Sequence, residues 1–121
     1  MIELHHVSLL VADTTRSLDF YCGLHGLTVD ASRPDLGYPG AWLQLGNGQI
    51  HIMELPNPDP TVNRPAHGGR DRHIALVVSD LDELLDRLDA AGIPYTRSKS
   101  GRRAAFTRDY DGNAVELVEK P

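Results

Sequence analysis

The chain has 121 residues, a length that suits one compact domain with its own hydrophobic core. Its 12 basic and 17 acidic residues give a formal net charge of -5, and the arginines are scattered, with only Arg102 and Arg103 adjacent. This balance argues against nucleic acid or an anionic membrane as the main partner, because both require clustered positive charge.

Targeting and redox signals are weak in this sequence. The first residues, MIELHH, lack the basic start and the apolar run of about 7 to 15 residues of a secretory signal, and no segment reaches the roughly 18 apolar residues that span a bilayer. The single cysteine, Cys22, has no partner for a disulfide within the chain, which fits a reducing compartment. We therefore expect a cytoplasmic protein with no membrane partner.

The first predicted element is an apolar strand, LHHVSLLV, at residues 4–11. Side chains alternate between the two faces of a strand, so His6 and His5 point to opposite sides. An imidazole in such a strand is commonly a core or strand-end residue hydrogen-bonded to the backbone. One histidine therefore does not identify a site.

A helix and three short strands come after this first strand. Asp13 stands where a helix N-cap belongs, and Gly26 stands where the helix ends. Strand-like runs then cover residues 27–32, 41–45 and 49–55, and the last two are joined by GNG, which predicts a hairpin. Four prolines and two adjacent glycines make the next segment, residues 56–72, a loop or an ordered lid.

The rest of the chain repeats the same series of elements. A strand from His73 precedes Asp80, a predicted N-cap, and the apolar stripe of a helix, and strand-like runs come next at 95–98, 104–108 and 114–119. The two segments HHVSLLVADTTRSLDFYCGLHGL and RHIALVVSDLDELLDRLDAAGI align through two turns of helix without a gap. The alignment places His6 on His73, Val11 on Val78, Asp13 on Asp80 and Leu18 on Leu85, and with one residue deleted it places Gly26 on Gly92.

The repeat predicts the fold class. We expect an α+β protein with two βαβββ modules, module one at 1–55 and module two at 73–121, within a single domain spanning 1–121. Neither module is long enough to bury its sheet alone, so we expect the two sheets to pair and curl around a common metal or ligand cavity.

Four side chains of metal-binding types occupy positions that the repeat makes equivalent. Aligning QIHI with AVEL sets His51 on Glu116, in addition to His6 on His73. Three or four such groups facing an apolar interior without partners would each cost roughly 1 to 3 kcal/mol. A shared divalent cation would remove that cost, whereas separate hydrogen bonds at strand ends, with Glu116 solvated, are the alternative.

These segments, together with the closing FTRDYDGNAVELVE, resemble the vicinal oxygen chelate superfamily, which includes glyoxalase I, extradiol dioxygenases and bleomycin-resistance proteins. The resemblance implies a metal site with ligands from the first and last strands, here His6, His73 and Glu116. In glyoxalase I the fourth position is a glutamate that serves as ligand and base, whereas this chain has His51 there. His51 is therefore expected to act as a fourth ligand or as the catalytic proton acceptor.

The expected function is that of a metal-dependent lyase, isomerase or dioxygenase. Its substrate would be a small molecule that chelates Fe, Mn, Ni or Zn through neighbouring oxygens. Arg102 and Arg103 are candidates for holding an anionic group of that substrate, and Trp42 for lining the cavity, although exposed arginines are often only solvated and strand aromatics are often core. We expect a homodimer, with each cavity closed within one chain or between partners.

Two other functions compete with this one. The cavity of a bleomycin-resistance type of protein sequesters a small molecule without breaking a bond, and such proteins usually lack metal ligands at these positions. A thiol transferase of the fosfomycin-resistance type shares the set of two histidines and one glutamate. It ranks lower because the basic features that its chemistry requires near the site are not evident in this chain.

Overall fold

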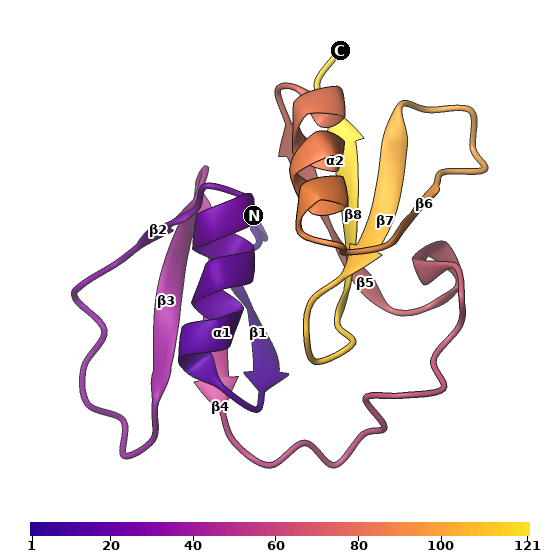
Figure 1. The fold of residues 1–121 in the computed structure, drawn as a ribbon. Helices are drawn as coiled ribbons and strands as arrows, with labels where there is room; N and C mark the ends of the chain where they lie inside the picture. Colours follow the sequence, from indigo (N-terminus) through magenta and orange to yellow (C-terminus); the bar gives the residue numbers. More distant parts are fainter. The chain divides into compact units, whose positions relative to one another are not determined.

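The computed structural model describes residues 1–121 and divides into two compact units, Met1–Asp59 and Pro60–Pro121. Each unit contains one βαβββ module, which confirms the predicted α+β fold (Figure 1). The first comprises β1 His6–Val11, α1 Thr14–Leu18, the π-helix η1 Asp19–Leu24, β2 Thr28–Val29, β3 Gly40–Leu45 and β4 Gly48–Glu54. The second comprises the 3₁₀ helix η2 Gly68–Arg70, β5 His73–Val78, α2 Leu81–Ala90, β6 Tyr95–Arg97, β7 Ala104–Arg108 and β8 Ala114–Glu119.

The two sheets have the same strand order, β1-β4-β3-β2 and β5-β8-β7-β6. In each sheet the first strand runs parallel to the last, and the remaining neighbours are antiparallel. Both sheets are open, with the first strand at one edge and the shortest strand at the other. A cavity enclosed by both sheets therefore remains a prediction.

Helix caps begin both helices where the sequence predicts them. The carboxylate of Asp13 accepts a hydrogen bond from the backbone N–H of Arg16 at 3.2 Å, and that of Asp80 accepts one from Glu83 at 3.0 Å. Each bond satisfies one of the backbone donors left free in a first helical turn. The helices of both modules lie across one face of their own sheet (Figure 1).

The helix of module one carries the one residue by which the repeats differ in length. After five α-helical residues it continues as a π-helix, in which the N–H of His25 bonds to the carbonyl of Phe20, five residues earlier. A π-helical turn absorbs one extra residue without displacing the rest of the module. Gly26 and Gly92 therefore still end their helices in the same conformation, with φ of 75° and 70°.

The shared face of helix and sheet forms the core of each module. In module one this core contains Phe20, Tyr21, Leu43, Ile50 and Ile52, and in module two it contains Leu81, Leu85, Leu88, Val115 and Leu117. Strand residues between these buried positions point to the other face of the sheet. None of the helices has the length and apolar character required to cross a membrane.

The largest difference between a predicted and an observed strand is in the run 27–32. The run 27–32 forms only β2, Thr28–Val29, because the Asp30 carboxylate accepts a hydrogen bond from the N–H of Ser32 at 2.9 Å and turns the chain. The GNG hairpin is confirmed by the antiparallel pairing of Leu45 with Gly48.

Candidate functional site

The candidate residues of module one share the sheet face that the helix does not cover. Strand register places Trp42 and Ser8 on either side of His51, and places His6 beside Gln49, which is two residues from His51 on β4. Neighbours in register point to the same side of a sheet. The buried Ile50 and Ile52, which flank His51, point to the opposite side.

His51 lies in a stack of three aromatic rings. Its ring is 3.9 Å from that of His6, at an angle of 14°, and 4.6 Å from that of Trp42, at an angle of 9°. Burial lowers the pKa of His51, and electrostatic interactions with His6, His5 and Arg33 lower it further. The imidazole therefore favours its neutral form, in which one nitrogen carries a lone pair for a metal or a proton.

Gln49 determines which ring nitrogen of His51 carries the lone pair. Its amide nitrogen donates to Asp30 at 2.8 Å and to Gln44 at 3.0 Å, so its Oε1 is the acceptor at 2.8 Å from Nε2 of His51. The proton of neutral His51 is thus on Nε2, and Nδ1 carries the lone pair. Sequence reasoning missed Gln49, although its spacing of two residues from His51 places both on one face of a strand.

His6 has a different partner. Its Nδ1 lies 2.8 Å from Nδ1 of His5, so one of the two rings donates to the other. The prediction that these neighbours point to opposite faces is not met at the side-chain ends, because the exposed His5 turns its ring toward His6, with centroids 5.0 Å apart.

Module two brings its two candidates into direct contact. Nε2 of His73 lies 3.3 Å from Oε1 of Glu116, and the Glu116 side chain is only 5% exposed. Two donors each about 2.1 Å from one ion, at an angle between about 90° and 110°, lie about 3.0 to 3.4 Å apart. The separation of His73 and Glu116 matches that of two ligands of one metal ion.

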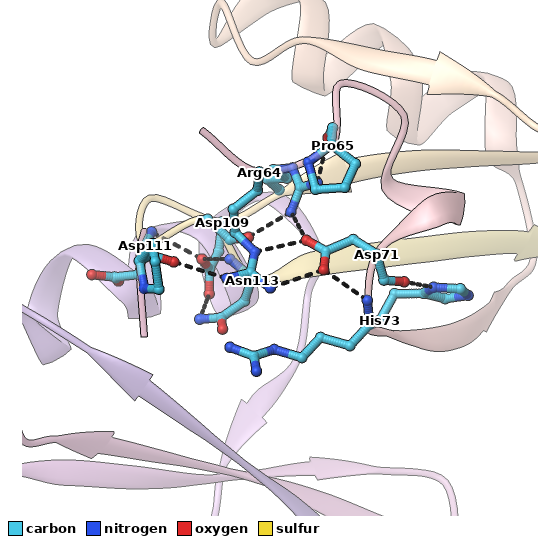
Figure 2. Close-up of polar contacts among 11 residues, drawn as sticks. Arg64, Pro65, Asp71, His73, Asp109, Asp111 and Asn113 are labelled. Carbon is cyan, nitrogen blue, oxygen red and sulfur yellow. Dashed lines mark hydrogen bonds and ion pairs between the residues drawn. The ribbon is translucent and has the colours of Figure 1, made fainter. Parts of the chain in front are cut away.

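A backbone carbonyl orients the ring of His73. Nδ1 of His73 donates to the carbonyl oxygen of Asp71 at 2.8 Å, as Figure 2 shows. A carbonyl only accepts, so the proton is on Nδ1, and in the neutral ring Nε2 has the lone pair that faces Glu116. This module therefore brings one imidazole lone pair and one carboxylate oxygen close together.

The two candidate arginines lie in different surroundings. Arg102 donates from Nη2 to Oε2 of Glu116 at 2.8 Å, while its own side chain is 60% exposed. Arg103 donates instead to Glu119 at 2.8 Å and to Asp82 at 2.9 Å. Arg102 thus joins the Glu116 cluster, and Arg103 links β8 to the start of α2.

Glu54 belongs to the helix rather than to the candidate site. Its Oε1 accepts from the N–H of Thr14 at 2.8 Å, and the equivalent residue of module two, Glu119, accepts from the N–H of Leu81 at 2.9 Å. Both bonds satisfy the first backbone donor of a helix. The carboxylate of Glu54 therefore stabilises the start of α1.

Within either module, no group of three or more His, Cys, Asp or Glu side chains is arranged to hold a metal ion. The candidates instead form two pairs, His6 with His51 and His73 with Glu116. Each pair comes from the first and last strand of its own module, as the repeat predicts.

The family model that matches this chain is that of the glyoxalase/bleomycin resistance protein/dioxygenase superfamily, over residues 3–117. A protein named glyoxylase I 4 from Arabidopsis thaliana is 30% identical over 97% of this chain and 70% of its own length. A lactoylglutathione lyase from Escherichia coli O157:H7 is also 30% identical, over 98% of this chain and 93% of its own length.

Solved structures give the same fold. A glyoxalase family protein from Bacillus anthracis superposes with a TM-score of 0.81 at 22% identity, covering 100% of this chain and 97% of the other. A mutant of the fosfomycin resistance protein FosX from Listeria monocytogenes, complexed with Mn(II) and 1S,2S-dihydroxypropylphosphonic acid, superposes with a TM-score of 0.78 at 21% identity, covering 100% and 95%.

Proposed function

Because this chain belongs to the glyoxalase/bleomycin resistance protein/dioxygenase superfamily, we propose that it is a metal-dependent enzyme acting on a small substrate with two neighbouring oxygens. His6, His73 and Glu116 are the proposed ligands of a divalent metal, and His51 is the proposed proton acceptor. The observation that carries the proposal is the geometry of module two. There, Nε2 of His73 and a buried carboxylate oxygen of Glu116 converge at 3.3 Å.

In this proposal, the bound metal, His51 and Trp42 have different chemical roles. A bound divalent metal supplies Lewis acidity, which stabilises negative charge on substrate oxygens. His51 holds a lone pair on Nδ1 and is neutral at physiological pH, so it accepts a proton from a carbon or oxygen placed beside it. Trp42, stacked on His51, keeps that ring oriented and excludes water from one side of it.

Arg102 is the proposed anchor for an anionic group of the substrate. Its side chain is 60% exposed. Its Nη2 donates to Glu116 and its Nε to Ser100, which leaves the N–H groups of Nη1 for an anionic group next to the proposed ligand. The FosX structure is complexed with a phosphonic acid. Two relatives that are each 30% identical to this chain are named lactoylglutathione lyase. The phosphonic acid and lactoylglutathione are both small anionic molecules, which supports an anionic substrate for this chain.

Metal analysis combined with a substrate screen tests the proposal. The protein is purified without chelators and its metal content is measured. It is then depleted, reloaded with Mn, Fe, Ni or Zn, and assayed on lactoylglutathione and on fosfomycin with thiols or water. We expect about one metal per site, lost in a folded His73→Ala variant, and turnover only in reloaded protein.

The competing function is ligand sequestration without catalysis. A protein that retains no metal, is unaffected by His73→Ala, and binds small molecules tightly in a thermal-shift screen with EDTA would contradict the proposal and favour that function. We further propose that the chain forms a homodimer, which light scattering of the purified protein tests directly.

A further inference from the structure

The last part of the connector is held by one carboxylate with four donors. Asp71 accepts from Nε and Nη2 of Arg64 at 2.7 and 2.8 Å, from Nη1 of Arg108 at 2.8 Å, and from the N–H of Arg72 at 2.8 Å (Figure 2). Its side chain is only 8% exposed. Charge-assisted hydrogen bonds to a shielded carboxylate are among the stronger polar contacts in proteins. Asp71 is therefore fixed in place.

Arg108 connects this carboxylate to the sheet. It is the last residue of β7, and it also donates to the carbonyls of Gly112 at 2.8 Å and Pro65 at 2.6 Å. Gly112 lies in the turn between β7 and β8, where the buried Asp109 accepts from the N–H groups of Asp111 and Asn113, each at 2.9 Å. Arg108 thus ties the connector to a rigid hairpin turn.

The backbone of Asp71 connects this network to the ring of His73. Its N–H donates to the carbonyl of Gly68 at 3.1 Å, and its own carbonyl accepts from Nδ1 of His73 at 2.8 Å. The hydrogen bond made by one ring nitrogen of a histidine decides which nitrogen carries the proton. The position of the Asp71 carbonyl therefore controls the tautomer of His73.

We propose that Asp71 and Arg108 are positioning residues that keep the His73 proton on Nδ1, so that Nε2 serves as a ligand. The proposal rests on the proposed function only in assigning Nε2 of His73 as a metal ligand. Neither residue touches metal or substrate in this scheme; both act through the Asp71 carbonyl. The alternative is that the Asp71 network only stabilises the connector.

Histidine NMR of the metal-free protein separates the two roles. With imidazole nitrogens labelled, two-bond ¹H–¹⁵N correlations at a pH where His73 is neutral identify the protonated nitrogen. We expect Nδ1–H in wild type and a shift toward Nε2–H in Arg108→Met. Arg87→Met is the matched control, because it removes an arginine of the same module whose ion pair with Glu83 lies on the exposed face of α2. The control should keep the wild-type tautomer.

Arg64→Met provides a second variant if Arg108→Met does not fold. It removes the two hydrogen bonds from Arg64 to Asp71 and leaves Arg108 on β7. A measurable shift toward Nε2–H supports the proposal. An unchanged tautomer in whichever folded variant is measured, with only a lower melting temperature, would overturn it and leave a structural role.

Titration with Mn(II) or Zn(II) by calorimetry adds an independent measurement. A partner that orients a metal-bound histidine is typically worth about 10- to 100-fold in affinity, and we expect Arg108→Met to weaken binding by that factor. If wild-type protein binds no metal while Arg108→Met still shows the tautomer shift, the result contradicts the proposed function and supports the positioning role. If wild-type protein binds metal while neither Arg108→Met nor Arg64→Met changes the tautomer or the affinity, the result contradicts the positioning role and supports the proposed function.

Discussion

The two modules share a backbone and differ in the side chains at equivalent positions. His6 and His73 both begin the first strand of a sheet, yet Nδ1 of His6 faces the ring of His5, whereas Nδ1 of His73 faces the carbonyl of Asp71. On the last strands, His51 lies in an aromatic stack, while Glu116 lies between His73 and Arg102. Module one thus offers a neutral imidazole and module two a shielded carboxylate.

The same comparison shows where the modules have not diverged. Asp13 and Asp80 cap their helices in the same way, and Glu54 and Glu119 both accept from the first helical N–H. These residues stabilise the βαβββ unit itself, so both copies need them. On the sheet face that the helix leaves free, by contrast, His51 occupies the position that Glu116 has in module two.

The largest expected effect comes from removing the carboxylate that only module two has. Glu116→Gln keeps the shape of the side chain but removes the charge that the proposed metal requires. We expect loss of metal binding by about 100-fold or more and, with it, loss of turnover, measured by calorimetry and by metal analysis. Glu119→Gln, on the same strand but bonded to α2, is the control and should bind metal like wild type.

Removing the imidazole of module one should separate binding from catalysis. We expect His51→Ala to retain the metal and to lose about 10²- to 10⁴-fold in kcat, because it removes a general base. Metal content and steady-state kinetics on the same preparation check this. If the metal is lost together with turnover, His51 is a fourth ligand rather than the base.

The helix caps should respond alike in both modules. We expect Asp13→Ala and Asp80→Ala each to lower the free energy of unfolding by about 1 kcal/mol, because each leaves a first-turn N–H without its acceptor. Urea unfolding measures the change. Asp86→Ala, which alters an exposed position within α2, should change it far less; equal losses in all three would contradict the capping role.

The smallest expected effect concerns acid stability. Hydrogen bonds from Arg103 and from the Leu81 N–H lower the pKa of Glu119 below its ordinary value of 4.5. A carboxylate with a lowered folded-state pKa contributes stability above its unfolded pKa, and this is lost as pH falls through the folded pKa. We expect the free energy of unfolding of Glu119→Gln to fall less steeply than that of wild type below about pH 4.5. Urea unfolding at a series of pH values measures this, and a curve parallel to that of wild type would contradict it.

Much of the fold and part of the candidate site were predictable from local patterns. The strand and helix periods, the two aspartate caps and the GNG hairpin depend on neighbours in sequence, and their repetition alone sets His51 on Glu116. The β2 strand and the π-helix were less predictable. Both depend on how single turns close, as Asp30 with Ser32 and Phe20 with His25 show.

The tautomer-setting partners lay beyond those patterns. Gln49 and Asp71 are each two residues from the histidine they orient, but only the fold shows that one acts through its amide and the other through its backbone carbonyl. Arg108 is 37 residues from Asp71, and no spacing rule connects them. Arg102 and Arg103 are adjacent in the loop before β7 yet are bonded to different carboxylates, and only the fold shows which carboxylate each side chain reaches.

The sequence by itself determined the repeated βαβββ pattern and the equivalence of His6 with His73 and of His51 with Glu116, because both depend on hydrophobic period and local capping. Only the tertiary structure decided which nitrogen of His51 and His73 carries the proton, and that His73 and Glu116 lie 3.3 Å apart. The reason is physical. Hydrophobic period is a property of neighbouring residues, whereas hydrogen-bond direction depends on atoms that folding brings together from distant parts of the chain.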